Sequence, residues 1–384
     1  MKKLVLLTSV VAASATLSAA PLITIGDEVD VFFTGSVIGK WTSNLYWSEN
    51  KVDDYVYTFR LGAEANYGRN SKFKASVKFY EDINTYLQQT QQNNNLANVF
   101  ANATYTEDRW FVAANFSFQQ LAQNTDTTTN TDTLVRSDVY SASINGSYSF
   151  TDKLSADLGF YWYEQNYVEQ FANTYSDLDS YRVPVSILYK ITDKISAGLT
   201  YQYRYSEYTG GNIYSAQQFG SETNDHFVGI TIRGELLPKL SAETFFGYTL
   251  RELNNAQDTD DSTFAFSVKL NYMVTDKVST FLKSGRDFGN GASRQSSTIT
   301  YVEGGVNYAF SQYVSSYASL RFANSAYLAS PRDDDNYSAN VGINYTPTRY
   351  LSVGATYSYQ NNASNLAGCS YMAHLISIRV DLKY

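Results

Sequence analysis

The stretch from Thr192 to Ser206 decides the fold, and it reads Thr-Asp-Lys-Ile-Ser-Ala-Gly-Leu-Thr-Tyr-Gln-Tyr-Arg-Tyr-Ser. A polar turn comes first, and strict alternation follows. One face carries Ile195, Ala197, Leu199, Tyr201, Tyr203 and Tyr205, and the other carries Ser196, Gly198, Thr200, Gln202, Arg204 and Ser206. Alternation with a period of two indicates a β-strand with two different faces. A soluble sandwich can show the same alternation in short strands, but a run of about eleven residues is close to the length that a tilted strand needs to cross a bilayer.

The same unit recurs along the chain. Each copy is a polar turn followed by the apolar residue that opens a new strand, and these opening residues are Phe73, Trp110, Leu154, Ile195, Leu240, Val278, Val314 and Leu351. Their spacing of about 36 to 45 residues fits two membrane-length strands, one short turn and one longer loop. With a first copy near Val29, the repeat predicts about nine hairpins, or about eighteen strands.

The composition supports a membrane barrel over several soluble domains. The 384 residues include 34 tyrosines and only 5 prolines, and the mean hydropathy is −0.32. After residue 20, no stretch approaches the roughly 18 continuous apolar residues of a transmembrane helix. Because transmembrane strands alternate apolar and polar residues, a barrel does not show in such a scan. The net charge of −8 argues against a nucleic-acid partner.

The N-terminus predicts a secretory signal peptide. Met1-Lys2-Lys3 is basic, Leu4 to Ala13 is apolar, and Ser14 to Ala20 is rich in small residues. We therefore expect residues 1–20 to be the signal peptide and residues 21–384 to form the barrel. Pro21 directly after residue 20 is unfavourable for cleavage, so the cut site stays open, and an uncleaved anchor helix fits less well because the apolar run is too short. Cys369, in a predicted loop, is the one cysteine and cannot form an internal disulfide.

Alternation assigns the strands. They are expected near 29–41, 55–67, 73–83, 96–105, 110–119, 137–150, 154–165, 181–190, 195–206, 224–234, 240–251, 263–273, 278–287, 298–309, 314–324, 336–345, 351–360 and 372–384. Residues 21–28 are expected to be a short periplasmic lead-in, and Pro184 is expected to cause a local bulge in mid-strand. The last strand alternates from His374 to the terminal Tyr384, which is typical of outer-membrane proteins. The predicted fold is all-β: a single transmembrane, antiparallel, up-and-down barrel in the outer membrane, with short periplasmic turns and long extracellular loops.

The parity of each strand predicts which side chains line the lumen, since charge avoids the lipid face. The basic candidates are Lys40, Arg60, Lys74, Lys78, Arg182, Arg204, Arg233, Arg251, Lys269, Lys283, Arg321 and Arg379. The inward acids are fewer: Asp30, Glu64, Asp157, Glu243, Asp287, Glu303 and Asp381. This ratio favours a passage with some preference for anions. The alternative is that the charges solvate a wet wall and pair across strands.

Inward aromatic residues suggest a path for sugars. They include Tyr161, Tyr163, Tyr301 and Tyr317. Sugar rings have apolar faces that stack on aromatic rings, so these tyrosines are candidates for guiding a glycan. Packing around inward glycines explains them equally well.

Enzyme chemistry is not expected. The two histidines, His226 and His374, fall on the outward face near the extracellular rim, where a catalytic dyad with an inward partner is not possible. No Cys/His cluster suggests zinc, and we expect no cofactor. Two acidic runs, Asp258 to Asp261 and Asp333 to Asp335, lack an EF-hand pattern and fit solvated loops better than calcium sites.

Several short motifs resemble the beta-barrel porin-2 family of Gram-negative bacteria. The quoted motifs are Ser43-Asn44-Leu45-Tyr46, Asp53-Asp54-Tyr55, Asn66-Tyr67-Gly68, Phe79-Tyr80 and the loop Asn93-Asn94-Asn95, together with the Thr-Asp-Lys turns and the terminal strand. The resemblance implies a barrel of about this strand number. It also implies a link to exopolysaccharide export with periplasmic export proteins. No functional residue is carried over from it.

These observations predict an outer-membrane channel. Our first hypothesis is an export conduit for polysaccharide. The expected partners are the lipid bilayer, the barrel-assembly machinery and, for this hypothesis, the polysaccharide and periplasmic export proteins. The alternatives are a general diffusion porin for small solutes, and a structural or adhesive barrel whose long loops bind partners.

Overall fold

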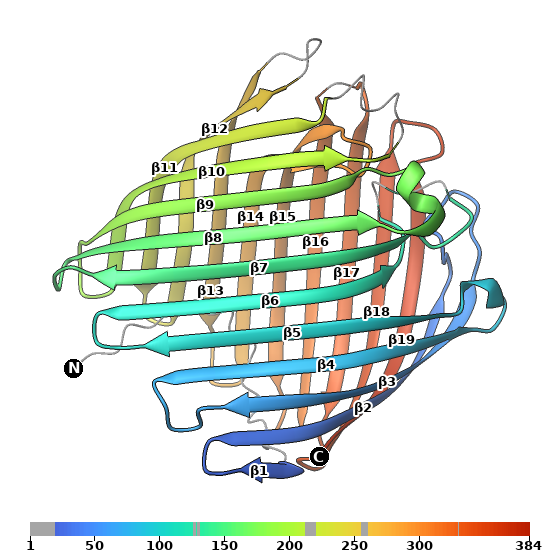
Figure 1. Cartoon of the computed structure of the whole chain (residues 1–384), viewed down its shortest axis with the longest axis horizontal. Coiled ribbons are helices and arrows are strands. Elements are labelled where there is room, and N and C mark those ends of the chain that lie inside the picture. Colours follow the sequence, from blue (N-terminus) through green and yellow to red (C-terminus); the bar gives the residue numbers. More distant parts are fainter. Residues whose placement is uncertain (1–19, 126–127, 129–130, 212–219, 255–259, 329) are drawn as a thin grey trace.

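The repeated alternation forms one continuous sheet in a computed structural model, which describes residues 20–125, 128, 131–211, 220–254, 260–328 and 330–384. The strands, shown in Figure 1, are β1 (Ile23–Ile25), β2 (Val29–Thr42), β3 (Asp54–Tyr67), β4 (Phe73–Tyr86), β5 (Asn94–Thr106), β6 (Trp110–Ala122), β7 (Arg136–Ser149), β8 (Leu154–Tyr167), β9 (Asp177–Lys190), β10 (Ile195–Thr209), β11 (Glu222–Leu237), β12 (Leu240–Leu253), β13 (Asp261–Met273), β14 (Val278–Asn290), β15 (Ser296–Ala309), β16 (Val314–Tyr327), β17 (Asp333–Tyr345), β18 (Leu351–Ser364) and β19 (Tyr371–Lys383). Two short 3-10 helices, η1 (Thr90–Gln92) and η2 (Glu169–Asn173), lie in loops. The predicted signal peptide falls outside the described residues except for Ala20.

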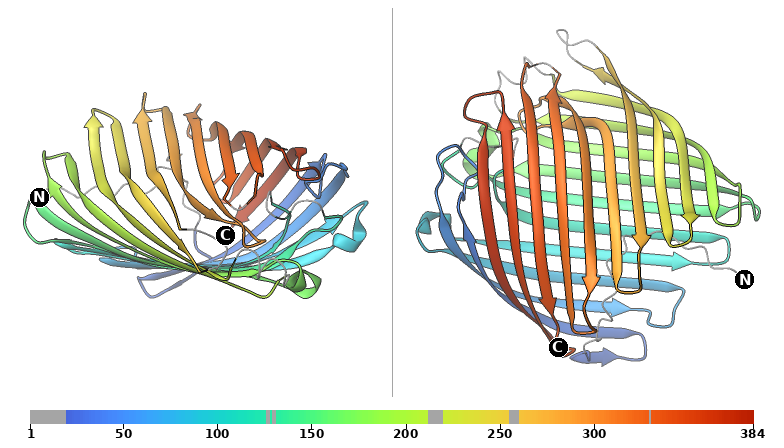
Figure 2. Two further views of the ribbon diagram at one scale, coloured as in Figure 1. Left: turned by 90° about the horizontal axis from the view of Figure 1, so that it is seen from above. Right: turned by 180° about the vertical axis from the view of Figure 1, so that it is seen from behind.

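The last strand closes the sheet on the first long one. β19 pairs antiparallel with β2, from Leu375 opposite Thr42 to Lys383 opposite Thr34. Every other long strand pairs with its neighbours in sequence, so β2 to β19 make a closed up-and-down barrel of eighteen strands, as predicted. The front and back walls cross each other in Figures 1 and 2, as they do when strands are tilted to the barrel axis.

The lead-in before β2 contains a short strand that the alternation did not predict. β1 pairs with β2 from Ile23 opposite Val31 to Ile25 opposite Val29. Directly above it, the terminal residue Tyr384 exchanges two backbone hydrogen bonds with Phe33, of 2.6 and 2.9 Å. β1 therefore continues the ladder where β19 ends. It covers backbone groups of β2 that would otherwise form an open sheet edge.

The recurring polar turn has a common hydrogen-bonding pattern. The Thr192 hydroxyl oxygen accepts the backbone N–H groups of Lys194 (3.3 Å) and Ile195 (3.1 Å). The hydroxyls of Thr151, Thr275, Ser311 and Thr348 accept the equivalent pairs of N–H groups. A side chain that bonds to backbone two and three residues ahead fixes a tight turn. This is the physical reason that a hydroxyl residue opens so many copies of the unit.

The outer face carries apolar side chains between two rows of aromatic rings. Ring pairs near the short turns include Trp110–Tyr148 at 4.4 Å, and pairs near the long loops include Phe118–Tyr140 at 4.9 Å. Leucines between the rows, such as Leu199 and Leu320, are about 70% exposed. Aromatic girdles around an apolar band are the lipid-facing pattern of outer-membrane barrels. In the part of the chain that the structure describes, no helix is long and apolar enough to span a membrane.

Pro184 does not form the bulge that we predicted. The β8–β9 register is the same at Leu158 opposite Val185 and at Tyr161 opposite Arg182, and only the pairs between them are missing. Gly159 lies opposite Pro184, and a Cβ on this glycine would come within 2.9 Å of the proline ring. The missing side chain of Gly159 thus makes room for the ring, so the strand tolerates proline without a shift in register.

We expect Gly159→Ala to reduce the free energy of unfolding by about 1–3 kcal/mol, because the new methyl group has no space beside Pro184. Gly304→Ala is the matched control, since a Cβ there meets only ordinary contacts at 3.7 and 3.8 Å. Urea unfolding of both variants in lipid vesicles, followed by tryptophan fluorescence, measures the difference. Equal stability of the two variants would contradict the role assigned to Gly159.

Candidate functional site

The β14–β15 hairpin leaves the barrel wall near its extracellular end and turns into the lumen. Pairing between β13 and β14 stops at Phe266 opposite Arg286, although β14 continues to Asn290 and stays paired with β15. Beyond this point, the Thr249 hydroxyl of β12 donates to Asp287 of β14 at 2.9 Å. This contact passes over β13, which lies between them in the sheet, so β14 must sit inside the wall. Figure 2 shows β13 and β14 separating toward the loop end.

The tip of this hairpin reaches the loops of the facing wall. Arg294, which is 5% exposed, donates to the Ser176 hydroxyl (2.9 Å) and to the backbone oxygens of Gly210 (2.8 Å) and Gly220 (3.2 Å). The Ser176 N–H in turn donates to the Ala292 oxygen at 2.9 Å. Burial lowers the pKa of Arg294, and the charge is solvated by these neutral oxygens. The hairpin therefore crosses the mouth of the barrel and is held at both ends.

An apolar cluster supports the same contact. Val135, Tyr167, Phe171 and Tyr175 pack together above β7 and β8, and Ala292 of the hairpin tip packs against them. Burial raises the pKa of Tyr175 in this cluster. The tip thus rests on a dry surface as well as on hydrogen bonds.

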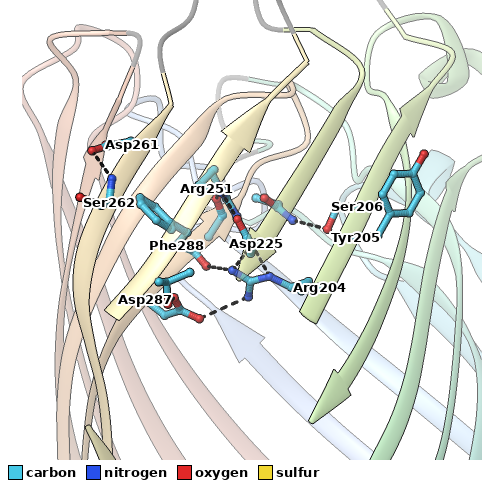
Figure 3. A network of polar contacts seen from close by, with 12 residues as sticks. Arg204, Tyr205, Ser206, Asp225, Arg251, Asp261, Ser262, Asp287 and Phe288 are labelled. Carbon is cyan, nitrogen blue, oxygen red and sulfur yellow. Dashed lines mark hydrogen bonds and ion pairs between the residues drawn. The ribbon is translucent and has the colours of Figure 1, made fainter. Parts of the chain in front are cut away.

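A buried charge network ties the hairpin to the wall (Figure 3). Asp225 of β11 accepts from Arg251 of β12 at 2.7 and 2.8 Å and from Arg204 of β10 at 2.6 Å. Arg204 also lies 3.4 Å from Asp287 and donates to the Phe288 oxygen at 3.1 Å, while Arg251 donates to the Gly289 oxygen at 3.1 Å. Arg251 is 0% exposed and Asp225 is 2% exposed. Buried ions are stable only when paired and hydrogen-bonded in this way, so the network fixes the inward position of β14.

Most of the predicted lumen bases are paired with acids. The pairs are Arg60–Asp82, Arg204–Asp225, Arg233–Asp157, Arg251–Asp225, Lys269–Glu243, Lys283–Glu303 and Arg379–Asp381. Asp82 and Asp225 are inward acids that we did not predict, although their parity with Lys78 and Arg233 would have identified them. The lumen is therefore more nearly balanced in charge than the sequence predicted. These residues mainly form ion pairs, all of them across strands except Arg379–Asp381, which lies within β19.

Five of the candidates differ from this pattern. The residues that form no ion pair with the part of the chain that the structure describes are Lys40, Lys74, Lys78, Arg182 and Arg321. Three of them lie over aromatic rings instead: Lys78 over Tyr80 at 5.4 Å, Arg182 over Tyr161 at 4.1 Å and Arg321 over Tyr301 at 5.2 Å. These positions leave positive charge free to act on a solute.

The predicted inward tyrosines mostly cover glycines. Cβ atoms built on Gly159, Gly285 and Gly342 would come within 3 Å of the rings of Tyr161, Tyr301 and Tyr317. The Tyr163 hydroxyl donates to Gln165 at 2.9 Å. Packing around glycine therefore accounts for three of the four rings, and a continuous sugar path is not needed to explain them.

The histidines and acidic loops are engaged in protein contacts. His226 and His374 each bond through Nδ1 to an outward tyrosine of the neighbouring strand, Tyr201 and Tyr357, both at 2.9 Å. Asp333 and Asp335 accept from Asn324, and Asp334 pairs with Arg332. Asp258 lies outside the described residues. Among those described, no group of three or more His, Cys, Asp or Glu side chains is placed to hold a metal ion.

Part of the chain matches a known protein family. Residues 221–384 match the family model described as Putative beta-barrel porin 2. The chain has an outer-membrane porin fold. The match confirms the resemblance to the beta-barrel porin-2 family for the C-terminal part, including the Thr275-Asp276-Lys277 turn and the terminal strand, but it does not reach the N-terminal motifs quoted above. No curated protein sequence matches the chain.

Solved structures with a similar fold are bacterial outer-membrane proteins. The outer membrane protein opdK from Pseudomonas aeruginosa aligns with a TM-score of 0.48 and 9% sequence identity. The alignment covers 92% of this chain and 99% of opdK. Acinetobacter baumannii OccAB2 aligns with a TM-score of 0.48 and 10% identity, over 93% of this chain and 98% of that one. Pseudomonas aeruginosa OccK3 (OpdO) aligns with a TM-score of 0.47 and 11% sequence identity, over 92% of this chain and 96% of that one. The closed barrel is established by the strand pairing of this chain itself.

Proposed function

We propose that this outer-membrane barrel is a diffusion channel for small hydrophilic solutes, and that the inward β14–β15 hairpin sets its narrowest cross-section. The observation that carries the proposal is the bonding of Arg294 to loops of the facing wall. Charged side chains line the wall on both sides of the hairpin. Such a wet, constricted lumen suits small polar solutes. The family description, a beta-barrel porin, agrees with this function.

The hairpin favours this function over our first hypothesis, export of a polysaccharide. A polymer in transit needs an open passage along the whole axis, whereas the hairpin tip crosses the mouth and is held by hydrogen bonds, ion pairs and apolar contacts. The near balance of lumen charge also weakens the argument for an acidic polymer. Partners such as periplasmic export proteins are not required for passive diffusion.

Liposome swelling and planar-bilayer recordings test the proposal. We expect purified protein to give stable single-channel currents. We also expect swelling rates that fall steeply from monosaccharides to trisaccharides, because the constriction excludes the larger sugars. Heat-denatured protein serves as the control for leakage. Swelling that hardly depends on size up to long oligosaccharides would favour the polymer conduit. A folded barrel without current would contradict a diffusion channel and favour a structural or adhesive role.

A further inference from the structure

A cavity lies in the lumen just inside the hairpin. Its volume is about 380 Å³, and its lining includes Asn115, Ser143, Tyr161, Ser180, Arg182 and Arg204, together with Asn290 of the hairpin. Small-molecule sites typically have volumes of about 300–1,000 Å³. The cavity is therefore large enough for a sugar-sized solute and lies on the path that such a solute would follow.

Two arginines of this cavity lie opposite each other but differ in their partners. Arg182 of β9 and Arg204 of β10 are direct neighbours in the register. Like charges in this position repel each other. Arg204 is neutralised by Asp225 and Asp287. Arg182 forms no ion pair of its own with the described residues, and Asp287, which pairs with Arg204, acts on it only from a longer distance. Three arginines (Arg182, Arg204 and Arg251) therefore share two carboxylates (Asp225 and Asp287), which leaves one net positive charge.

The Arg182 guanidinium is positioned rather than free. Its carbon lies 4.1 Å from the ring centre of Tyr161, and that ring is itself packed over Gly159. Stacking holds the plane of a guanidinium and leaves its N–H edge available. Two such N–H groups match the two oxygens of a carboxylate.

The other groups of the cavity suit a hydroxylated ring. Asn115 donates to the Ser143 hydroxyl at 3.2 Å, and Ser143 lies opposite Tyr161 in the register. The Ser180 hydroxyl is 2.9 Å from that of Ser206. Hydroxyl and amide groups can exchange hydrogen bonds with sugar hydroxyls. A tyrosine ring beside them can cover the apolar face of the sugar.

We propose that this cavity is a binding subsite for a sugar acid, a single ring of pyranose size whose carboxylate is held by Arg182. The inference rests on the proposed function, because it assumes that small solutes enter the lumen. Occupation of the subsite supplies the counter-charge that Arg182 lacks. A sugar phosphate presents a related anion with greater charge, and the test separates the two.

Arg182→Gln tests the subsite, and Arg321→Gln is its matched control. Arg321 also lies over a tyrosine without an ion pair, but on the far wall in β16. Binding of glucuronate, glucose and glucose 6-phosphate to the detergent-solubilised barrel is measured by calorimetry, and block of single-channel current is measured in parallel. Heat-modifiable gel mobility shows that each variant is folded.

We expect glucuronate to bind and to block the current of the wild-type channel, with glucose at least tenfold weaker. Arg182→Gln should weaken the binding of glucuronate at least tenfold, which corresponds to the loss of one charge-assisted hydrogen bond. Arg321→Gln should change the affinity for glucuronate less than twofold. If glucuronate does not bind, if Arg182→Gln leaves its affinity unchanged, or if glucose 6-phosphate binds tenfold more tightly, the sugar-acid subsite is wrong. Because binding is measured without transport, a silent channel that still binds glucuronate through Arg182 overturns the diffusion function and not the subsite.

Discussion

Replacing the hairpin tip, residues 291–295, by Asn-Gly is expected to raise the single-channel conductance by roughly twofold or more. Asn-Gly supplies a tight two-residue turn between antiparallel strands, so β14 and β15 can stay paired. The change removes Arg294 and its bonds to Ser176, Gly210 and Gly220. It also removes Ala292 from the apolar cluster of the facing loops. The lumen mouth then loses the segment that crosses it, and the swelling cut-off should move to larger sugars.

The matched control shortens a loop that does not cross the lumen. Residues 365–370 between β18 and β19 contact other loop residues, such as Glu49 and Pro331. Replacing them by the same Asn-Gly turn should leave conductance within the spread of wild-type channels. A similar rise in both variants would mean that loop length in general limits the current. No rise in the hairpin variant would refute the assignment of the constriction.

Asp225→Ala is expected to lower the free energy of unfolding by about 3–5 kcal/mol, since it leaves the buried Arg251 and the half-buried Arg204 without their shared counter-ion. Arg251 is 0% exposed, and its only ion pair among the described residues is with Asp225. Arg204 keeps Asp287, at 3.4 Å. Urea unfolding in lipid vesicles measures the loss, and single-channel recordings should show more frequent transitions between current levels as β14 loosens.

Asp157→Ala provides the comparison for this large effect. Asp157 pairs with Arg233 across β9 and β10, but these side chains are 25% and 30% exposed. Water can therefore solvate Arg233 when its partner is removed, and we expect a loss of about 1 kcal/mol or less. If the two substitutions cost the same, burial of the Asp225 network is not what stabilises the inward hairpin.

Much of the fold could be predicted because strand formation here is a local property of the chain. The alternation from Ile195 to Ser206, repeated after each hydroxyl-led turn, determined the strand number, the lipid-facing and lumen-facing sides and the position of the short turns. The alternation from His374 to Tyr384 predicted the closing strand, which pairs with β2 as expected. Even Asp82 and Asp225 followed from parity, although we missed them.

The sequence alone did not predict the constriction. The alternation of β14 breaks at Arg286, which places a charge at a lipid-facing position beside the last β13–β14 pair. This break could have marked the point where the strand leaves the wall, but it does not show that the hairpin turns into the lumen. The tolerance of Pro184 likewise depends on Gly159, which the register places opposite it. Arg182 was one of twelve predicted lumen bases, and it stood out among them as a binding residue only when Arg204 was found to pair with both nearby acids.

Alternation needs only the residues of one strand, so the sequence determined the barrel, its strand count and its faces. The position of the β14–β15 hairpin depends on contacts among β10, β11, β12 and β14, together with loops about seventy to a hundred and twenty residues away from Arg294. These partners meet only after the barrel has closed, because loop entropy separates them in the unfolded chain. Only the tertiary structure therefore decided where the lumen narrows and which of its charges remain free to bind a solute.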